Sequence, residues 1–449
     1  MKNTEQFIGK RVLVVGLAKS GMAAAGLLHR LGAEVIVNDA RPLEGNEEAA
    51  TLQALGIEVI GGGHPSDLLE RGFDIIVKNP GIPYSNSLIT QALERGLRIW
   101  TEVELAGLIS EASIIAITGS NGKTTTTTLL YHMLNIGKKK PLIAGNIGTV
   151  ACTVAEKAKN DEVMVLEASS FQLAGTENFK PHIAIFTNLY DAHLDYHGST
   201  TEYLDAKLQV ARNQTAEDFL IYNNDQEIVR SSVETMHAQK IPFSTEGKVV
   251  EGISADEEWI YWLGEPFIST KEIKLPGRHN LENILAATAA AILTGCKKTA
   301  IENVLSSFTG VRHRMQFVRE FNGRTIYNDS KATNTLATKS AISSFKQPVI
   351  LIAGGLERGH SFEELRPHMN NIRTVVAIGE TAERFTEFAK SCGVEQSLLA
   401  TTMEDAVKVA YESSSEDDVI LLSPSCASWD QYPSFEIRGD QFIHAVMKL

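Results

Sequence analysis

A short glycine loop between an aliphatic strand and a helix constrains this chain more than any other stretch. Residues 114–117 are aliphatic, and they lead into Thr118-Gly119-Ser120-Asn121-Gly122-Lys123-Thr124-Thr125. The two glycines let several backbone N–H groups point at one anion, and the next helix adds its positive end. Lys123 would reach the outer phosphates of a nucleotide, and the hydroxyl of Thr124 suits Mg²⁺. The pattern therefore predicts a phosphate-binding loop rather than an ordinary strand–turn–helix junction.

Two departures from general nucleotide-binding motifs narrow the choice of ligand. The phosphate loop has Ile117 where the general pattern has its first glycine, so it is a shortened form. At the amino terminus, strand 11–15, turn 16–21 and strand 34–39 form a βαβ start whose second strand ends in an acid. Ala18 replaces the glycine that lets backbone approach a pyrophosphate, which argues against NAD or FAD. Another nucleotide and a purely structural turn both remain open.

Length, charge and cysteine content limit the class of protein. The chain has 449 residues, enough for about three domains, and its net charge is -13. Its longest basic run is 138–140, which argues against nucleic acid as a partner. The 4 cysteines are not spaced as metal pairs and are too few for a disulfide framework. There is no signal-peptide core and no apolar run of the ~20 residues that span a bilayer, so we expect a cytoplasmic protein without a membrane partner.

Strands alternate with helices along the whole chain, which predicts an α/β protein. We place three domains at residues 1–106, 107–310 and 311–449, Rossmann-like at each end and like a phosphate-loop ATPase in the centre. The expected strands lie within residues 11–15, 34–39, 74–77, 98–102, 114–117, 162–170, 182–188, 259–270, 325–327, 348–355, 374–379 and 418–424. A capping box at 199–202 should start one helix, and another should cover 284–293.

Several side chains stand where the carboxyl ends of parallel strands would meet. Glu167 ends a buried strand, and Mg²⁺ prefers carboxylate and phosphate oxygens, although a solvent-facing glutamate is the alternative. His193 lies in a loop rich in metal-capable side chains, and Lys207 lies on the next helix; spacing alone also allows a loop histidine and a surface lysine. Asn280 and Asn283 share one helix face, where they could recognise a nucleotide base or cap the helix.

Taken in chain order, these motifs resemble the ATP-dependent Mur ligases of peptidoglycan synthesis. The stretches that carry the resemblance are 118–125, 145–148, 167–173, 191–195, 203–207, 277–283, 313–314 and 328–334. They span all three expected domains, and they are specific jointly rather than singly. The tail 423–432 with 435–439 is similar to the branch of this family that adds D-glutamate.

The resemblance implies that the first domain holds a uridine nucleotide sugar, the central domain binds ATP, and the third domain receives the amino acid. The implied reaction makes an amide: the carboxylate of UDP-N-acetylmuramoyl-L-alanine attacks the γ-phosphate of ATP, and the amine of D-glutamate displaces phosphate from the acyl phosphate. The residues implied for the UDP-sugar are Leu17, Ala18, Asp39, Arg41, Gly81, Asn146 and Ser169.

For ATP, the resemblance implies contacts from all parts of the loop and from the third domain. The implied ATP-binding residues are Gly119, Asn121, Gly122, Lys123, Thr124, Thr125, Asn280, Asn283, Arg314, Asp329 and Lys331. Two Mg²⁺ ions are expected, held by Thr124, Glu167, His193 and Lys207. Because an ammonium would repel Mg²⁺, Lys207 is expected to be carbamylated, as the matching lysine of the family is. Lys123, Glu167, His193, Lys207 and Arg314 form the implied catalytic set.

The two carboxylates of D-glutamate need donors, and the resemblance implies Thr333, Ser428 and the backbone near Phe435. Some family members have a lysine after the double glycine at 354–355, whereas Arg358 is the cation here. Arg358 would grip a carboxylate with two prongs rather than as a point charge.

Three alternatives remain open. A sister ligase, or one of the folylpolyglutamate type, would use another amino acid with the same chemistry. A phosphate-loop NTPase of another class would hydrolyse ATP for motion or transport. A catalytically dead UDP-sugar-binding regulator is the third, and the joint presence of Lys123, Glu167, His193 and Lys207 argues against it. We expect a monomer.

Overall fold

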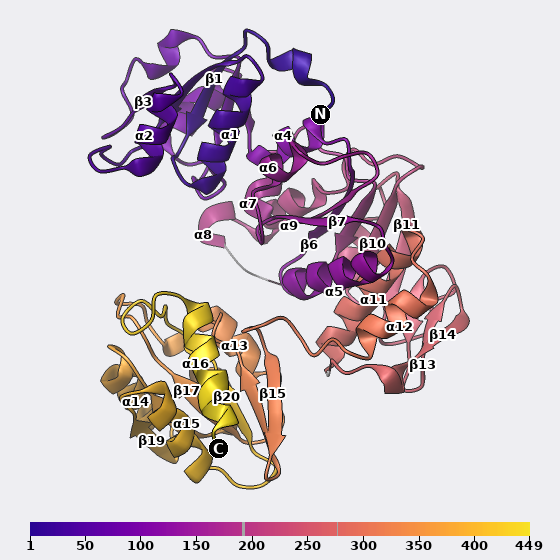
Figure 1. Ribbon diagram of the computed structural model, residues 1–449, viewed down its shortest axis with the longest axis vertical. Helices are drawn as coiled ribbons and strands as arrows, with labels where there is room; N and C mark the ends of the chain where they lie inside the picture. Colours follow the sequence, from indigo (N-terminus) through magenta and orange to yellow (C-terminus); the bar gives the residue numbers. More distant parts are fainter. Residues whose placement is uncertain (191–193, 276) are drawn as a thin grey trace. The chain divides into compact units, whose positions relative to one another are not determined.

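The computed structural model describes residues 1–190, 194–275 and 277–449, and His193 therefore lies outside the described residues. Backbone contacts divide the chain into two compact units, Met1–Phe308 and Thr309–Leu449. The first unit contains two sheets and the second unit contains one, each with helices packed on it (Figure 1). The predicted α/β class is confirmed.

The first sheet has five parallel strands in the order β3-β2-β1-β4-β5. Its strands are β1 (Arg11–Val15), β2 (Glu34–Asn38), β3 (Glu58–Ile60), β4 (Ile75–Lys78) and β5 (Arg98–Trp100). Its helices are η1 (Thr4–Phe7), α1 (Lys19–Arg30), α2 (Glu47–Ala54), η2 (Leu68–Arg71), α3 (Ser87–Glu94) and α4 (Glu102–Ile109). The carboxyl ends of β1 and β4 lie side by side at Val15 and Lys78, and the loops after these two strands can share a ligand.

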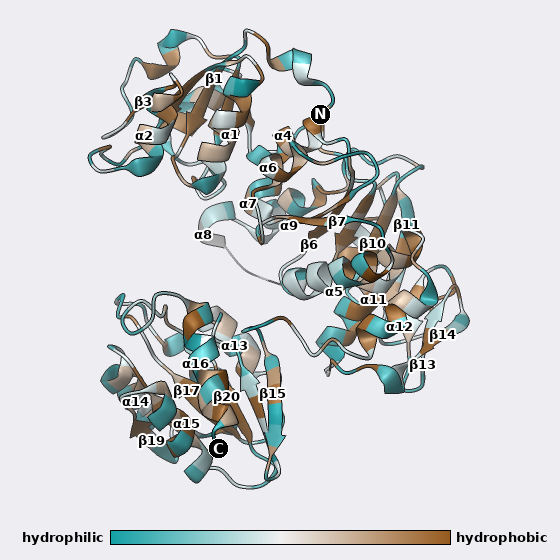
Figure 2. Cartoon of the chain, in the orientation of Figure 1, coloured by the Kyte–Doolittle hydropathy of each residue, from teal (hydrophilic) through white to brown (hydrophobic). Residues whose placement is uncertain are grey.

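The second sheet has nine strands in the order β14-β13-β12-β11-β10-β9-β6-β8-β7, antiparallel only among β12, β13 and β14. Its strands are β6 (Ser113–Thr118), β7 (Pro141–Gly145), β8 (Val163–Glu167), β9 (Ile183–Phe186), β10 (Phe219–Asn223), β11 (Gln239–Ser244), β12 (Ile253–Ala255), β13 (Trp259–Trp262) and β14 (Glu265–Ser269). Its helices are α5 (Lys123–Ile136), α6 (Ala151–Ala155), α7 (Ser170–Leu173), α8 (Leu194–His197), α9 (Thr200–Leu208), α10 (Glu227–Ser232), η3 (Thr270–Glu272), α11 (Arg278–Leu293) and α12 (Lys298–Leu305). The aliphatic side chains of β6 are buried. Hydrophobic residues are brown in Figure 2, and this colour is concentrated on the strands.

The second unit has a six-stranded sheet in the order β15-β16-β20-β17-β18-β19, in which only the β15–β16 pair is antiparallel. Its strands are β15 (Gln316–Phe321), β16 (Arg324–Asn328), β17 (Val349–Ala353), β18 (Ile372–Ala377), β19 (Gln396–Leu399) and β20 (Val419–Leu422). Its helices are α13 (Thr335–Ile342), η4 (Glu363–Asn371), α14 (Ala382–Ser391), α15 (Met403–Glu412) and α16 (Phe435–Met447). The loops after β16, β20 and β17 therefore meet at one edge of the sheet.

Most strands expected from apolar runs are confirmed, with small shifts at their ends. The predicted strand 98–102 is too long, because Thr101 is already the N-cap of α4. Ser199 caps α9 by accepting the N–H of Glu202, as expected. Asn280 is not a helix cap, since α11 begins after Gly277. No described helix is long and apolar enough to cross a bilayer.

Candidate active site

The phosphate loop joins β6 to α5, and its backbone requires glycine at two points. Gly119 has φ +143° and Gly122 has φ +82°, conformations that other residues rarely adopt. A Cβ at Gly119 would collide with Oγ1 of Thr187, and one at Gly122 would collide with Oδ1 of Asn283. The loop is thus shaped by close neighbours as well as by its own sequence.

Residues at the end of β9 fasten this loop from the side. The backbone N–H of Ser120 donates to the Asn188 carbonyl oxygen at 2.9 Å, and the N–H of Asn121 donates to Oδ1 of Asn188 at 2.8 Å. The Thr187 hydroxyl donates to the Asn121 carbonyl oxygen at 2.7 Å. Two loop N–H groups are therefore used within the protein, and the amino end of α5 becomes the best place for a phosphate. Sequence reasoning assigned no role to Thr187 and Asn188, although they end the predicted strand 182–188.

Two lysine side chains meet at one carbonyl oxygen of the loop. Nζ of Lys123 and Nζ of Lys207 each donate to the Gly119 oxygen at 2.7 Å. The Lys207 side chain is only 1% exposed, and its amine lies 4.4 Å from the centre of the Tyr203 ring. Burial, reinforced by the Lys123 ammonium, lowers the pKa of Lys207 well below its ordinary value. An amine in this position is readily neutral.

Glu167 lies beside the start of the loop because β8 pairs with β6. The register places Glu167 opposite Ile117. The Glu167 side chain is 1% exposed, and its Oε1 accepts a hydrogen bond of 2.7 Å from Nδ2 of Asn146. Its Oε2 is buried and has no hydrogen-bond partner among the described residues. A buried carboxylate oxygen without a donor suits a cation.

The structure therefore offers part of the expected magnesium set. Thr124 is buried in the first turn of α5, and Glu167 and Lys207 are buried near the loop. The described residues contain no group of three His, Cys, Asp or Glu side chains that could hold a metal. Because His193 is outside the described part, an oxygen-rich site built on Glu167, Thr124 and phosphate is the arrangement that the described donors fit.

The two asparagines of α11 have different surroundings. Asn283 is buried under the loop, where its Oδ1 accepts a hydrogen bond of 3.3 Å from the Thr126 hydroxyl. Asn280 is half-buried on the same helix face, one turn earlier. Asn283 thus contacts the phosphate loop itself at Gly122, and Asn280 is the less buried of the two.

Two neighbouring cavities of about 520 and 280 Å³ lie at the carboxyl edge of the first sheet. Ala18 and Asn79 line both of them. Of the residues expected at the UDP-sugar, the larger cavity contains Ala18, Gly81, Asn146 and Ser169, and the smaller contains Ala18, Asp39 and Arg41. The larger cavity is lined by loops of both the first and the second sheet, so a ligand bound in it could contact both.

Leu17 lines neither cavity, but it contacts Asp39, which lines the smaller one. The buried Leu17 donates its backbone N–H to Oδ2 of Asp39 at 2.7 Å, and Arg41 Nε lies 3.1 Å from Oδ1. Burial alone would raise the pKa of Asp39, but these hydrogen bonds hold it below the ordinary value. A carboxylate at this sheet edge suits ribose hydroxyls, as in other nucleotide folds.

Sequence reasoning placed Gly81 near the UDP-sugar but assigned no role to Lys78, the last residue of β4. The ammonium of Lys78 donates to the Ile82 oxygen and to the Tyr196 hydroxyl, both at 2.9 Å. Burial lowers the pKa of Lys78 to about 7, and it makes no ion pair with any described residue. Because Tyr196 belongs to α8, this contact joins the loop after β4 in the first sheet to a helix that packs with the second sheet. The only signal in the sequence was a lysine at the end of an otherwise aliphatic strand.

In the second unit, Asp329 comes directly after β16 and is buried. Its Oδ1 accepts the Met315 N–H, and its Oδ2 accepts the Ser423 hydroxyl, each at 3.1 Å. Burial raises the pKa of Asp329 to about 7. The Lys331 ammonium lies 5.5 Å from the centre of the Phe435 ring, and Arg314 is only partly exposed.

The residues expected at D-glutamate lie on the same edge of this sheet. The Arg358 guanidinium lies 4.9 Å from the centre of the Trp429 ring, and both side chains are exposed. Ser428 is 2% exposed, and its hydroxyl has no hydrogen-bond partner in the described part of the chain. Thr333 is exposed after β16, and Phe435 begins α16. The unit thus brings its predicted residues to one set of loops.

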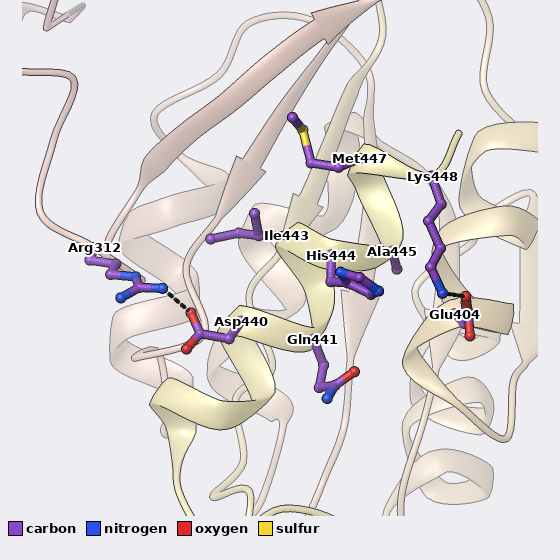
Figure 3. Close-up of a pocket in the computed structure, with 9 residues that line it drawn as sticks. All are labelled: Arg312, Glu404, Asp440, Gln441, Ile443, His444, Ala445, Met447 and Lys448. Atoms are coloured by element: carbon purple, nitrogen blue, oxygen red, sulfur yellow. Dashed lines mark hydrogen bonds and ion pairs between the residues drawn. The ribbon is translucent and has the colours of Figure 1, made fainter.

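A hollow of the second unit lies away from these loops. It measures about 670 Å³ and borders α16, where an Arg312–Asp440 and a Lys448–Glu404 ion pair flank it (Figure 3). None of the predicted site residues lines it. Its ionic side chains already have partners, and we assign it no part in the site.

The fold and the fastened loop define a nucleotide-binding α/β protein, and comparisons with known proteins identify its kind. Three family models match: Mur ligase MurD-like N-terminal domain at 10–101, Mur ligase middle domain at 117–291, and Mur ligase glutamate ligase domain at 313–426. The chain belongs to the Mur ligase family.

Curated relatives match over the full length. Proteins named UDP-N-acetylmuramoylalanine–D-glutamate ligase from Geobacillus sp. (strain WCH70) and Geobacillus kaustophilus (strain HTA426) are each 54% identical over 100% of both chains. Solved structures share the fold. MurC of Thermotoga maritima has a TM-score of 0.56 at 21% identity and covers 98% of this chain and 99% of its own. MurF of Thermotoga maritima in complex with ADP has a TM-score of 0.54 at 18% identity, covering 100% and 96%.

Proposed function

We propose that this Mur ligase joins D-glutamate to UDP-N-acetylmuramoyl-L-alanine in peptidoglycan precursor synthesis, with cleavage of ATP to ADP and phosphate. The observation that carries the proposal is the meeting of Lys123 and the buried Lys207 at the phosphate loop, near a Glu167 oxygen that has no partner among the described residues. Full-length relatives at 54% identity that carry this ligase name support the choice of amino acid. A cytoplasmic, monomeric enzyme with domains at 1–106, 107–310 and 311–449 is part of the proposal.

The first step brings two anions together. A carboxylate oxygen of the sugar peptide bonds to the γ-phosphorus of ATP, the bond to the bridging β–γ oxygen breaks, and ADP leaves. The Lys123 ammonium leaves the Gly119 carbonyl and pairs with phosphate oxygens, while Arg314 stabilises the charge on the γ-phosphate. The N–H groups at the start of α5 orient the phosphates.

Thr124, Glu167, His193 and a carbamylated Lys207 would hold Mg²⁺ at two sites. When bound, Mg²⁺ neutralises phosphate charge. The Lys207 amine is suited to carbamylation because burial favours its neutral form, and the neutral nitrogen adds to the carbon of CO₂ with loss of a proton. The product is an anion, which removes the repulsion between two neighbouring ammonium groups.

The second step makes the amide. The amine of D-glutamate attacks the acyl carbon, the tetrahedral intermediate loses phosphate, and the nitrogen loses a proton. Thr333, Arg358, Ser428 and the backbone near Phe435 would hold the two carboxylates. Asn280 would meet adenine, Asn283 would keep α11 against the loop, and Asp329 would accept the ribose hydroxyls, with Lys331 nearby. Leu17, Ala18, Asp39, Arg41, Gly81, Asn146 and Ser169 would surround the UDP-sugar.

The test is phosphate release with UDP-N-acetylmuramoyl-L-alanine and ATP while the amino acid is varied. Release that depends on D-glutamate, with amide product formed in equal amount, is expected. Release with a diamino acid instead would make this a sister ligase, and ATP hydrolysis that needs no amino acid would indicate an NTPase of another class. Lys123→Met should abolish release, whereas Lys271→Met, at an exposed lysine of η3, should not.

A further inference from the structure

Arg438 is a buried cation that forms no ion pair with a described acidic side chain. It lies on α16 one turn after Phe435, and its side chain is 1% exposed. It makes no ion pair within 4 Å with any described residue, and burial lowers its pKa to about 10, so it is still charged at neutral pH. A buried unpaired charge is costly to a fold, and an apolar side chain would fill the same space without that cost. The guanidinium therefore needs an explanation beyond packing.

The hydrogen bonds of Arg438 join two loops at the carboxyl edge of the sheet. Its Nε donates to the Ser330 hydroxyl oxygen at 3.0 Å, and its Nη2 donates to the backbone oxygens of Ser330 at 2.9 Å and Cys426 at 3.0 Å. Ser330 lies in the loop after β16, and Cys426 lies in the loop after β20. Because β16 and β20 are neighbours in the sheet, Arg438 bridges two adjacent loops.

The loop after β17 also lies against Arg438. Gly355 lies in the loop after β17, and a Cβ there would lie 3.1 Å from Nη1 of Arg438. The N–H of Leu356 donates to the Ala427 oxygen at 2.9 Å, which joins this loop to the one after β20. Nη1 is buried and has no hydrogen-bond partner among the described residues. Arg438 thus lies against all three loops.

Ser330 links this arrangement to the start of α16. Its hydroxyl donates to the Phe435 oxygen at 2.8 Å while it accepts from Nε of Arg438. The loops that Arg438 and Ser330 hold carry Thr333, Arg358 and Ser428, and α16 begins with Phe435. These are the proposed D-glutamate groups. A small shift of any loop would separate donors that must act on one ligand.

We propose that Arg438, acting through Ser330, is the positioning residue that holds the three amino-acid-binding loops of the second unit in register. The proposal rests on the D-glutamate function proposed above. Arg438 acts through the loops and not by touching the amino acid, because its side chain is buried behind them.

Steady-state kinetics of three full-length variants test this role. Ser330→Ala removes one hydroxyl and keeps the charge, and it should raise the KM for D-glutamate about fivefold, the scale of one hydrogen bond. Arg438→Lys keeps the charge but loses the fork, and it should raise that KM about tenfold or more. The KM for the UDP-sugar should change less than about twofold in both. Ser343→Ala is the control, because its hydroxyl contacts the His368 ring on an exposed face of the same unit. It should leave the KM values for D-glutamate, the UDP-sugar and ATP unchanged.

The double variant Ser330→Ala with Arg438→Lys provides a second measurement. Because the serine hydroxyl is a partner of Arg438, the combined rise in KM should be smaller than the product of the single rises. Unchanged KM values for D-glutamate in folded single variants would overturn the proposal, and so would equal rises for all three substrates or fully multiplicative effects. A wild-type protein that releases phosphate without D-glutamate would instead overturn the proposed function.

Discussion

Lys123 and Lys207 donate hydrogen bonds to the same backbone oxygen, that of Gly119, at 2.7 Å each. Two ammonium groups at one acceptor repel each other, and the deeply buried one loses its proton more readily. In the proposed mechanism the two lysines therefore have different roles: Lys123 remains a cation for phosphate, and Lys207 is the neutral amine that reacts with CO₂.

Activity should depend on CO₂ through Lys207. Removing CO₂ from the buffer is expected to lower D-glutamate-dependent phosphate release, and adding bicarbonate should restore it. Since only the neutral amine adds CO₂, reactivation should speed up as pH rises through the pKa of Lys207, at a lower pH than for an ordinary lysine. Lys207→Arg should lose about 100-fold or more in rate, the scale of one electrostatic group in an active site.

Lys271→Arg, at an exposed lysine, serves as the control for the CO₂ experiment. Its response to CO₂ should match that of the wild type. Full activity in CO₂-free buffer, with an unmodified chain by intact mass, would rule out a functional carbamate at Lys207.

Gly122 should tolerate no side chain. Gly122→Ala combines a φ of +82° with a collision against Asn283, so the KM for ATP should rise about tenfold or more and the stability should fall by about 1–3 kcal/mol. Gly56→Ala is the matched control, because Gly56 has φ +84° but open space around its Cβ position. It should show a loss of stability without any change in the KM for ATP. Equal kinetic effects in both variants would mean that the contact with Asn283 does not shape the loop.

Arg358 should matter for the amino acid and not for the nucleotide. Arg358→Ala is expected to raise the KM for D-glutamate about 10-fold to 100-fold, the value of a charge-assisted hydrogen bond, with the KM for ATP unchanged. The KM of Arg358→Lys for D-glutamate should lie between those of the wild type and Arg358→Ala, because a lysine offers a point charge instead of two parallel hydrogen bonds. Arg366→Ala, which removes a surface ion pair with Glu363 in the same unit, should leave both constants as they are. Parallel rises for both substrates in Arg358→Ala would exclude Arg358 from the amino-acid pocket.

Asp329 should make the second unit less stable as pH rises. Its pKa of about 7 in the folded chain lies above the ordinary value, so between about pH 4 and 7 the folded state holds a proton that the unfolded state has lost. Stability therefore falls through this window, by at most about 1.4 kcal/mol per pH unit, and levels off above it. Hydrogen exchange of the amides of β20 at several pH values measures the effect, after correction for the intrinsic rate.

Asp329→Asn cannot titrate, and it should remove this pH dependence. If the stability of the variant falls with pH as steeply as that of the wild type, another group causes the pH dependence.

Local patterns predicted the strand ends but not the contacts made across them. Glu167 could be placed because an acid comes at the end of an aliphatic run, and parallel strands bring such ends together. Lys207 had no local signal, and only the resemblance to a family separated it from a surface lysine. The fastening of the loop by Thr187 and Asn188 depends on which strand lies beside β6, and sequence spacing does not determine that neighbour.

Buried polar groups were the hardest to predict. Asn283 belonged to a plausible recognition face, yet the structure places it under the loop, because α11 packs closely on α5. Arg438 lay in a motif without any role assigned to it, since a guanidinium bonded to backbone oxygens leaves no pattern in the sequence. Short edge strands such as β15 and β19 were also missed, because their side chains are only partly buried.

The bond between Lys78 and Tyr196 bears on how this chain can be recombined with its relatives. The buried amine of Lys78 is bonded to an oxygen in the loop after β4 and to the hydroxyl of Tyr196 on α8. It therefore links the part of the chain around the first sheet to the part around the second. A chimera that exchanges residues 1–106 alone would separate this lysine from the tyrosine that it was matched to. Exchanging residues 1–308 together keeps the pair intact, so natural and engineered recombination should favour crossovers near 308 over crossovers near 106.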